Sequence, residues 1–276
     1  MKMIGKLNEK DLKINKKQMI LWMVGILAAV ILLMGFIVKV EPPAEGISRA
    51  EAAKALALVF EDPQTLEDMA SERENSSFTD KEKGNWFVKY MDYLYEKGYL
   101  DTEITPATLT SAQGNLTYED VNTVAEKLSS GLEKQVGMTR GNKKKTFSRN
   151  DWWELYKAIV KETDKDGNMK EVSAVLFGTP SNMEQAESWT AYTTEGTFGF
   201  QGLALDAYLD CEIRFWARGQ EMAGMTQIVS EEPVYKNIWV SDVKKDQFTV
   251  YIGKYVRTFT AEGKLASQAE EKNEEL

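Results

Sequence analysis

The sequence predicts an α+β protein with one N-terminal transmembrane helix, a helical repeat domain and a small antiparallel β barrel or sandwich. Three observations support this prediction. A run of 20 uncharged, mostly apolar residues occupies 19–38, three amphipathic segments with one start signal lie within 47–161, and β-branched or aromatic runs recur across 171–260. At 276 residues, with 43% hydrophobic and 28% charged residues, the chain can form one sizeable or two small domains.

The apolar run fits a membrane-spanning helix, because 20 residues at about 1.5 Å each cross roughly the 30 Å hydrocarbon core. We expect a tail over 1–17, a transmembrane helix over 18–40 and a stiff, proline-containing linker over 41–46. The tail holds six lysines against Glu9 and Asp11, a balance of +4. This charge predicts a single-pass protein of the cell membrane with a cytoplasmic N-terminus and an extracytoplasmic main domain. A cleaved signal peptide would have a shorter apolar stretch and a small-residue cleavage site.

The amino-acid composition excludes several classes of function. The chain has no histidine and one cysteine, Cys211, which excludes intramolecular disulfides, Cys/His metal clusters and Ser-His-Asp or Cys-His catalysis. We identify no catalytic constellation and expect neither a metal nor a cofactor. The net charge of −9, less the +4 of the tail, leaves −13, and such a domain repels nucleic acid. A carboxylate pair for glycoside cleavage stays open, because such partners are close in space and not in sequence.

Three segments within 47–161 share one helical register. Each places a hydroxyl residue three positions before a carboxylate, the spacing of a capping box, directly after an apolar residue. Apolar residues follow each cap at +4, +7, +8 and +11, the period of one buried helix face. We interpret the segments as an internal repeat. They begin Ile47-Ser48-x-x-Glu51, Leu116-Thr117-x-x-Asp120 and Phe147-Ser148-x-x-Asp151.

A further amphipathic stretch, Trp86–Lys97, ends at Gly98, which accepts the left-handed backbone beyond a helix. The helical pattern stops at the turn signal Asp166-Gly167. No helical crossover separates the β runs of 171–260, which favours antiparallel pairing, and the acidic tail 261–276 is expected to fray. The β runs are Val172–Phe177, Thr190–Phe200, Glu212–Ala217, Met222–Val229, Val234–Val240, Phe248–Ile252 and Tyr255–Thr260.

The helical region resembles S-layer homology repeats over about 115 residues, 47–161. Ile47-Ser48-Arg49-Ala50-Glu51 resembles their helix start, and Phe78-Thr79-Asp80, followed by Trp86 and Tyr90 to Gly98, resembles their opening half. The resemblance implies binding to secondary polymers of the cell wall of a Gram-positive bacterium.

Carried over residue by residue, the resemblance assigns polymer binding to Arg49, Trp86, Gly98 and Arg149. The middle repeat departs from the pattern, with Tyr118 in place of arginine, and its cap lies only 31 positions before the next. The cluster 143–145, three lysines, is compatible with an anionic polymer or lipid headgroup and with a solvated loop, the commoner case.

A second resemblance concerns the β region. Gly202–Arg218 and Val234–Trp239 look like the non-catalytic N-terminal part of some stage II sporulation protein D/LytB-like proteins. In such proteins a wall-cleaving or amidase-enhancing domain follows.

Three functions therefore stay open. The first is a membrane-anchored, non-catalytic protein that associates with the cell wall, its polymers or peptidoglycan. The second is the targeting portion of a wall-remodelling protein. The third is a membrane-tethered scaffold that binds an unidentified protein partner through strands containing Trp216 and Trp239.

Overall fold

The computed structural model describes residues 46–183, 186–231, 239–241, 243, 247–252, 255–260 and 270–271. The predicted tail (1–17), transmembrane helix (18–40) and linker up to residue 45 lie outside the described residues. Among those that are described, no helix has both the length and the apolar character to cross a bilayer. Pro43–Leu276 forms one compact unit by its internal contacts.

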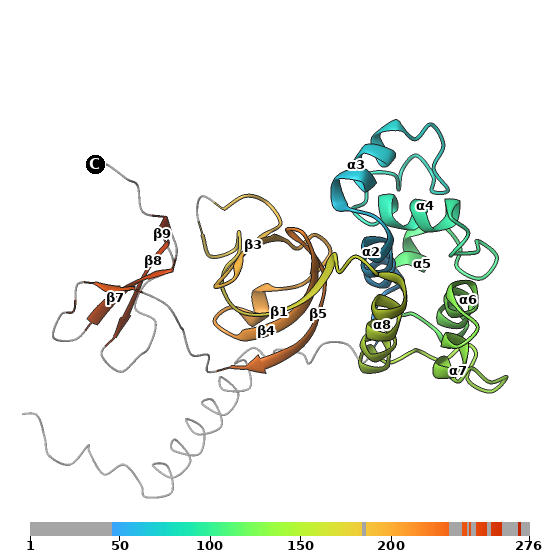
Figure 1. The fold of residues 1–276 in the computed structure, drawn as a ribbon. Coiled ribbons are helices and arrows are strands. Elements are labelled where there is room, and N and C mark those ends of the chain that lie inside the picture. Colours follow the sequence, from blue (N-terminus) through green and yellow to red (C-terminus); the bar gives the residue numbers. More distant parts are fainter. Residues whose placement is uncertain are drawn as a thin grey trace, which may run out of the picture. The chain divides into compact units, whose positions relative to one another are not determined.

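The mixed α+β class is confirmed, with helices in the first half of the described chain and strands in the second (Figure 1). Three helices follow the predicted caps: α2 (Arg49–Phe60), α6 (Tyr118–Leu128) and α8 (Arg149–Thr163). The Ser48 and Ser148 hydroxyls each accept from the backbone N–H three positions on, at 3.1 Å. Thr117 and Asp120 form a reciprocal capping box. The local signals therefore place these helix starts correctly.

The three caps meet in one place. Each cap segment forms a β-bridge with both of the others, so the three repeat helices start from a common ring. We call the segments 46–48, 115–117 and 146–148 the cap ring. Its bridges join Gly46 to Ser148, Ser48 to Asn115 and Thr117 to Thr146.

Four other helices complete this part of the structure. The stretch predicted from Trp86 forms α4 (Val88–Glu96), and Gly98 beyond it has the left-handed φ of +75°. Three of them were not predicted: α3 (Pro63–Glu72), α5 (Leu109–Gln113) and α7 (Leu132–Val136). Asp62 caps α3, with proline at its first position.

The first sheet contains β1 (Met169–Gly178), β2 (Thr190–Thr193), β3 (Gly196–Gly199), β4 (Glu212–Arg218) and β5 (Glu221–Ser230). These strands form a closed barrel in the order β1-β2-β3-β5-β4. The short helix η1 (Asp206–Tyr208) lies between β3 and β4 in the chain. This is the strand order of the OB-fold, a topology shared by proteins of many functions. Entirely antiparallel pairing was predicted, and that is wrong at one place, since β3 runs parallel to β5 where Gly199 meets Glu221.

The strands within 171–260 belong to two sheets. The later strands form a separate sheet, β6-β7-β8-β9. They are β6 (Trp239–Ser241), β7 (Gln247–Ile252), β8 (Tyr255–Thr260) and β9 (Glu270–Glu271), the last within the tail that was expected to be frayed. Tyr255 packs edge-on against Tyr192 of β2, with ring centroids 5.1 Å apart, so the second sheet shares an apolar cluster with the first.

The helices and the first sheet share one core. Trp216 of β4 lies edge-on to Tyr156 of α8 at 5.8 Å, and Ala223 of β5 belongs to the same buried cluster as the repeat helices. Arg218 donates to the carbonyls of Leu58 and Val59, both at 3.0 Å. These carbonyls lie in the last turn of α2, where a cation is favoured.

Candidate functional site

The two predicted binding arginines lie in ion pairs that connect successive repeats. Arg49 donates through Nε to Asp120 of the second repeat at 2.9 Å. Arg149 of the third repeat holds both oxygens of Glu51 in the first, at 2.6 and 2.9 Å. The two arginine side chains are only 17% and 20% exposed. Both guanidinium groups therefore stabilise the repeat assembly, and neither lines the groove described below.

The third position of this cycle has a tyrosine. Tyr118 packs edge-on against Phe147 at 4.9 Å, and it lines a cavity of about 370 Å³ together with Asp151. Asp151 is the third-repeat counterpart of Glu51 and Asp120, and its carboxylate accepts from the Ser148 hydroxyl at 2.6 Å. The arginine that the second repeat lacks would therefore stand beside Asp151, at the junction between the second and third repeats.

Gly98 has a helix-terminating role. A Cβ at this position would meet no atom within 4 Å, so the positive φ, and not close packing, favours glycine. Lys127 of α6 donates to the Gly98 carbonyl and thereby holds the turn against the second repeat helix. Gly98 is not among the residues that line the groove at Trp86.

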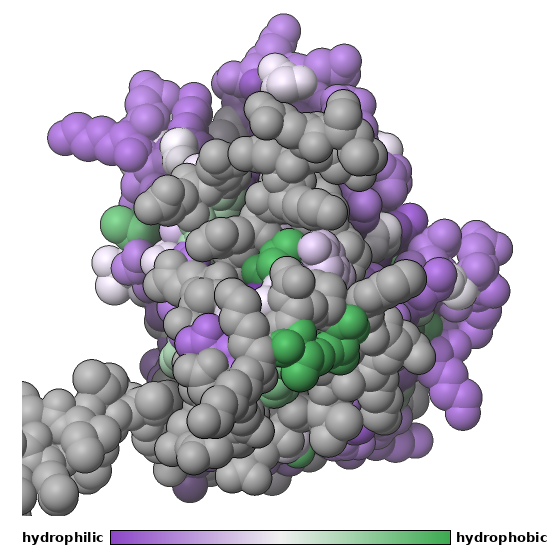
Figure 2. All heavy atoms as spheres, turned by 90° about the vertical axis from the view of Figure 1, so that its left-hand side faces the viewer, coloured by the Kyte–Doolittle hydropathy of each residue, from purple (hydrophilic) through white to green (hydrophobic). Residues whose placement is uncertain are grey.

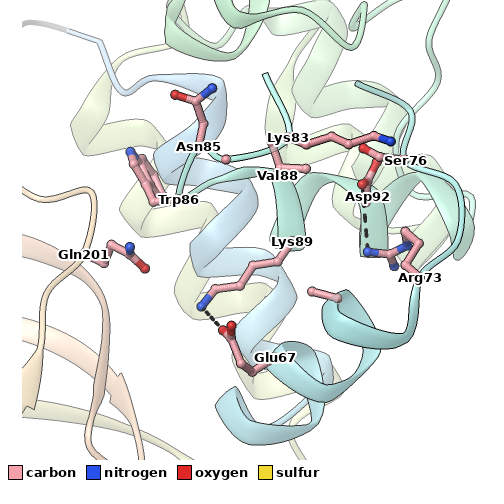
Figure 3. A pocket seen from close by; sticks show the side chains of 12 residues that line it. Glu67, Arg73, Ser76, Lys83, Asn85, Trp86, Val88, Lys89, Asp92 and Gln201 are labelled. Carbon is pink, nitrogen blue, oxygen red and sulfur yellow. Dashed lines mark hydrogen bonds and ion pairs between the residues drawn. The ribbon is translucent and has the colours of Figure 1, made fainter. Parts of the chain in front are cut away.

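Trp86 is the one predicted residue that lines a large open groove, of about 350 Å³. The groove runs between α3, the loop before α4, α4 itself and residue 201 of the barrel (Figure 3). We call it the Trp86 groove. Its lining offers an indole ring, two amide side chains and several charges; the polar residues labelled in Figure 3 are Glu67, Arg73, Ser76, Lys83, Asn85, Lys89, Asp92 and Gln201.

The charges of the Trp86 groove are partly paired. Lys89 bonds Glu67 at 2.6 Å across the opening between α4 and α3. Arg73 bonds Glu96 at 3.1 Å and lies 3.9 Å from the buried Asp92. The Asp92 carboxylate also accepts from the backbone of Ser77 at 2.9 Å. These contacts fix the arginine and the carboxylate before any ligand arrives.

Three cations line the groove in an otherwise acidic chain. Among the lining residues Arg73, Lys83 and Lys89 outnumber Glu67 and Asp92 by one, and Arg73 and Lys83 pair with the flanking Glu96 and Asp80. Lys83 is bonded to the exposed Asp80 at 2.8 Å, and its own side chain is 42% exposed. Such a pair is easily replaced by another anion, because exposed ion pairs are weak. The groove is therefore able to accept a ligand that carries negative charge.

The barrel contributes one wall of the groove through a loop that α2 holds in place. Lys54 is fully buried, donates to the Gln201 carbonyl at 2.8 Å and forms an ion pair with Glu221 at 2.5 Å. Burial lowers the pKa of Lys54, and the Glu221 carboxylate opposes this shift. Trp86 lies so close to Gly202 that a Cβ there would come within 2.4 Å of the indole. The indole thus connects the helical part to the barrel.

Several groove residues had no recognisable signal in the sequence. Arg73 ends a helix that the hydrophobic period did not reveal, and Gln201 comes from a loop more than 100 positions beyond Trp86. Lys83 and Lys89 do flank Trp86 within three residues, which is a local signal of a basic and aromatic surface.

The scaffold hypothesis depends on strands that contain Trp216 and Trp239. Trp216 is half-buried and packs on the helical core, so it does not form an exposed aromatic patch. The side chain of Trp239 lies outside what is described.

No family model, curated protein or solved structure matches this chain.

Proposed function

We propose that this chain is a membrane-anchored, extracytoplasmic, non-catalytic protein that associates with the bacterial cell wall through an anionic polymer held in the Trp86 groove. The single observation that carries the proposal is the composition of that groove. Trp86, Lys83 and Asn85 project from one loop into an open cavity of about 350 Å³. An aromatic face suits a sugar ring, amides suit hydroxyl groups, and lysines suit acidic substituents.

The N-terminal apolar run supports the anchor, and the resemblance to S-layer homology repeats supports the wall as the target. Arg49 and Arg149 do not belong to this binding site. Their paired state assigns them to the repeat assembly, and the ligand contacts belong to the loop before α4.

The test is co-sedimentation of the detergent-solubilised full chain with purified cell walls, before and after chemical removal of their secondary polymers. We expect binding that is lost with the polymers. Binding that survives their removal would contradict a polymer ligand, and no binding to either preparation would contradict wall association.

A matched pair of variants locates the site. Lys83→Glu reverses a charge inside the groove, whereas Lys81→Glu makes the same change two residues earlier, at an exposed position outside it. We expect the first to weaken binding at least about threefold, the effect of roughly 0.7 kcal/mol, and the second to leave it unchanged. Equal effects would show a diffuse electrostatic attraction and would remove the groove from the proposal.

A second candidate is a tethered scaffold for a protein partner. β6 is an outer strand of the second sheet, and Val240 within it is 48% exposed. The face seen in Figure 2 carries hydrophilic residues at its margin and exposes hydrophobic ones near its centre. Among the described strands none pairs with the outer edge of β6, and such an edge with an exposed apolar side chain suits strand addition by a partner. Val240→Lys would abolish partner capture from envelope extracts under this proposal and leave wall binding intact.

A further inference from the structure

A basic segment outside the Trp86 groove runs from the end of α7 into the loop before α8. Residues 134–146 contain five basic residues and neither aspartate nor glutamate, in a chain with a net charge of −9. We call this segment the basic loop. Its cations are Lys134, Arg140, Lys143, Lys144 and Lys145, all exposed.

The basic loop has a fixed shape. Thr139 donates its backbone N–H to the Asn142 side chain at 2.6 Å, and Asn142 donates from its amide to the Gly137 carbonyl at 3.3 Å. The carbonyls of Lys143 and Lys145 accept from the first two backbone N–H groups of α6 at 3.0 and 3.2 Å. The backbone is therefore held by the second repeat helix, while the long cationic side chains point outward.

The charges of the basic loop are largely uncompensated. Only Lys143 forms an ion pair within the described residues, with Glu119. Met138 adds an apolar side chain that is 37% exposed. Like charges at such spacing repel one another and destabilise the fold, unless an anionic surface lies opposite them.

The location of the loop identifies that surface. Gly46, the first described residue, forms a β-bridge with Ser148, and a Cβ on it would come 2.6 Å from the side chain of Thr146. The chain thus enters the folded part directly beside the basic loop. The expected linker, 41–46, is six residues long and spans at most about 20 Å.

We propose that the basic loop docks onto anionic lipid headgroups of the membrane in which the chain is anchored. This inference rests on the proposed transmembrane anchor. The linker limits the distance between the cap ring and the bilayer to about 20 Å. The loop is therefore able to reach the headgroups, where its charges act within about one Debye length. Each Lys or Arg near an anionic surface strengthens attachment about fivefold, and Met138 can enter the interface.

The test uses the full chain in vesicles of phosphatidylcholine alone or mixed with phosphatidylglycerol. Met138→Cys in a Cys211→Ser background carries an environment-sensitive fluorophore, and headgroup-labelled lipid serves as quencher. We expect strong quenching only in the anionic vesicles, with loss of quenching when salt near 1 M shortens the Debye length to about 3 Å.

A second label supplies the control position. α8 begins at the cap ring and has 15 residues, so its far end lies about 22 Å away. A fluorophore at Asp166→Cys should remain unquenched in both vesicle types. Lys144→Glu with Lys145→Glu should abolish quenching at position 138, whereas Lys161→Glu with Lys165→Glu, the same change at the far end of α8, should leave it.

Each outcome bears on a different proposal. Equal quenching at position 138 in neutral and anionic vesicles, or quenching unaffected by the reversal at 144 and 145, would overturn headgroup docking. So would a signal that responds to a soluble anionic polymer and not to anionic lipid. Failure of the chain to float with neutral vesicles would instead contradict the anchor itself.

Discussion

Arg149 and Glu51, separated by 98 positions, form a two-pronged ion pair that joins the third repeat helix to the first. Both side chains are largely shielded from water, at 20% and 12% exposure. A bidentate, partly buried pair is stronger than a surface pair, and removal of one partner leaves the other charge unsatisfied.

Arg149→Ala should therefore lower the free energy of unfolding by about 1–3 kcal/mol. The measurement is urea unfolding followed by circular dichroism. Lys157→Ala, which removes an exposed pair with Glu154 in the same helix, is the control and should cost at most about 0.5 kcal/mol. Similar losses for both variants would mean that the Arg149 pair has no special role in joining the repeats.

The junction between the second and third repeats lacks an arginine, and we expect that adding one there creates a favourable ion pair. Tyr118→Arg places a guanidinium beside Asp151, which has no arginine partner within the described part of the chain, whereas Glu51 and Asp120 each have one. The substitution also removes the contact with Phe147, so net stability is a poor readout and a double-mutant cycle with Asp151→Asn is needed. We expect a favourable coupling energy of about 0.5 kcal/mol. A coupling of zero would show that the three repeat junctions differ in geometry.

The buried pair of Lys54 and Glu221 predicts both a stability loss and a pH dependence. Lys54→Met should destabilise the protein by about 3 kcal/mol, because Glu221 is left without its partner. Adding Glu221→Gln should restore part of the loss. If the double variant is no more stable than Lys54→Met alone, the pair does not act as a unit.

The sign of the pH effect follows from the lowered pKa of Lys54. Between the folded-state pKa and the ordinary value of 10.5, the unfolded chain binds more protons than the folded one. The cost of burying the ammonium is complete below this window and is relieved as pH rises through it. The stability of the natural chain relative to Lys54→Met should therefore increase from neutral pH towards pH 10, measured by urea unfolding at each pH.

Glycine is required at position 202 by the backbone conformation and by the nearby Trp86 ring. Its φ is +85°, and a Cβ would clash with the Trp86 ring at 2.4 Å. Gly202→Ala should cost roughly 2–4 kcal/mol and reduce wall binding, because the indole must move. Gly219→Ala shares the positive φ, +56°, but meets no atom within 4 Å, so it should cost about 1 kcal/mol and leave binding unchanged.

The sequence predicted what depends on neighbouring residues. The caps at Ser48, Thr117 and Ser148 are confirmed, because a hydroxyl and a carboxylate three positions apart interact through local geometry. The helix α3 was missed even though Asp62-Pro63 is a start signal, since little of its surface is apolar and only Leu66 is buried.

What the sequence did not show depends on tertiary pairing. Arg49 and Arg149 resemble binding residues in their motif, but the carboxylates that hold them lie 71 and 98 positions away. The Trp86 groove likewise needs a barrel loop whose approach is fixed by Lys54, a residue that the helical period marks only as part of α2. Long-range contacts of this kind leave no periodic trace in one sequence.

The cap ring also determines when the first repeat can complete its contacts during synthesis. The segment 46–48 bridges Asn115, which lies 67 positions after Ser48, and Ser148, which lies 102 positions after Gly46, so these partners are synthesised roughly 3–20 s after it. Until α6 and α8 have been synthesised, the buried face of α2, which includes Leu56 and Leu58, has no other repeat helix to pack against. The first repeat to be synthesised thus completes its contacts only when the third repeat has been made, and the growing chain exposes apolar surface until then.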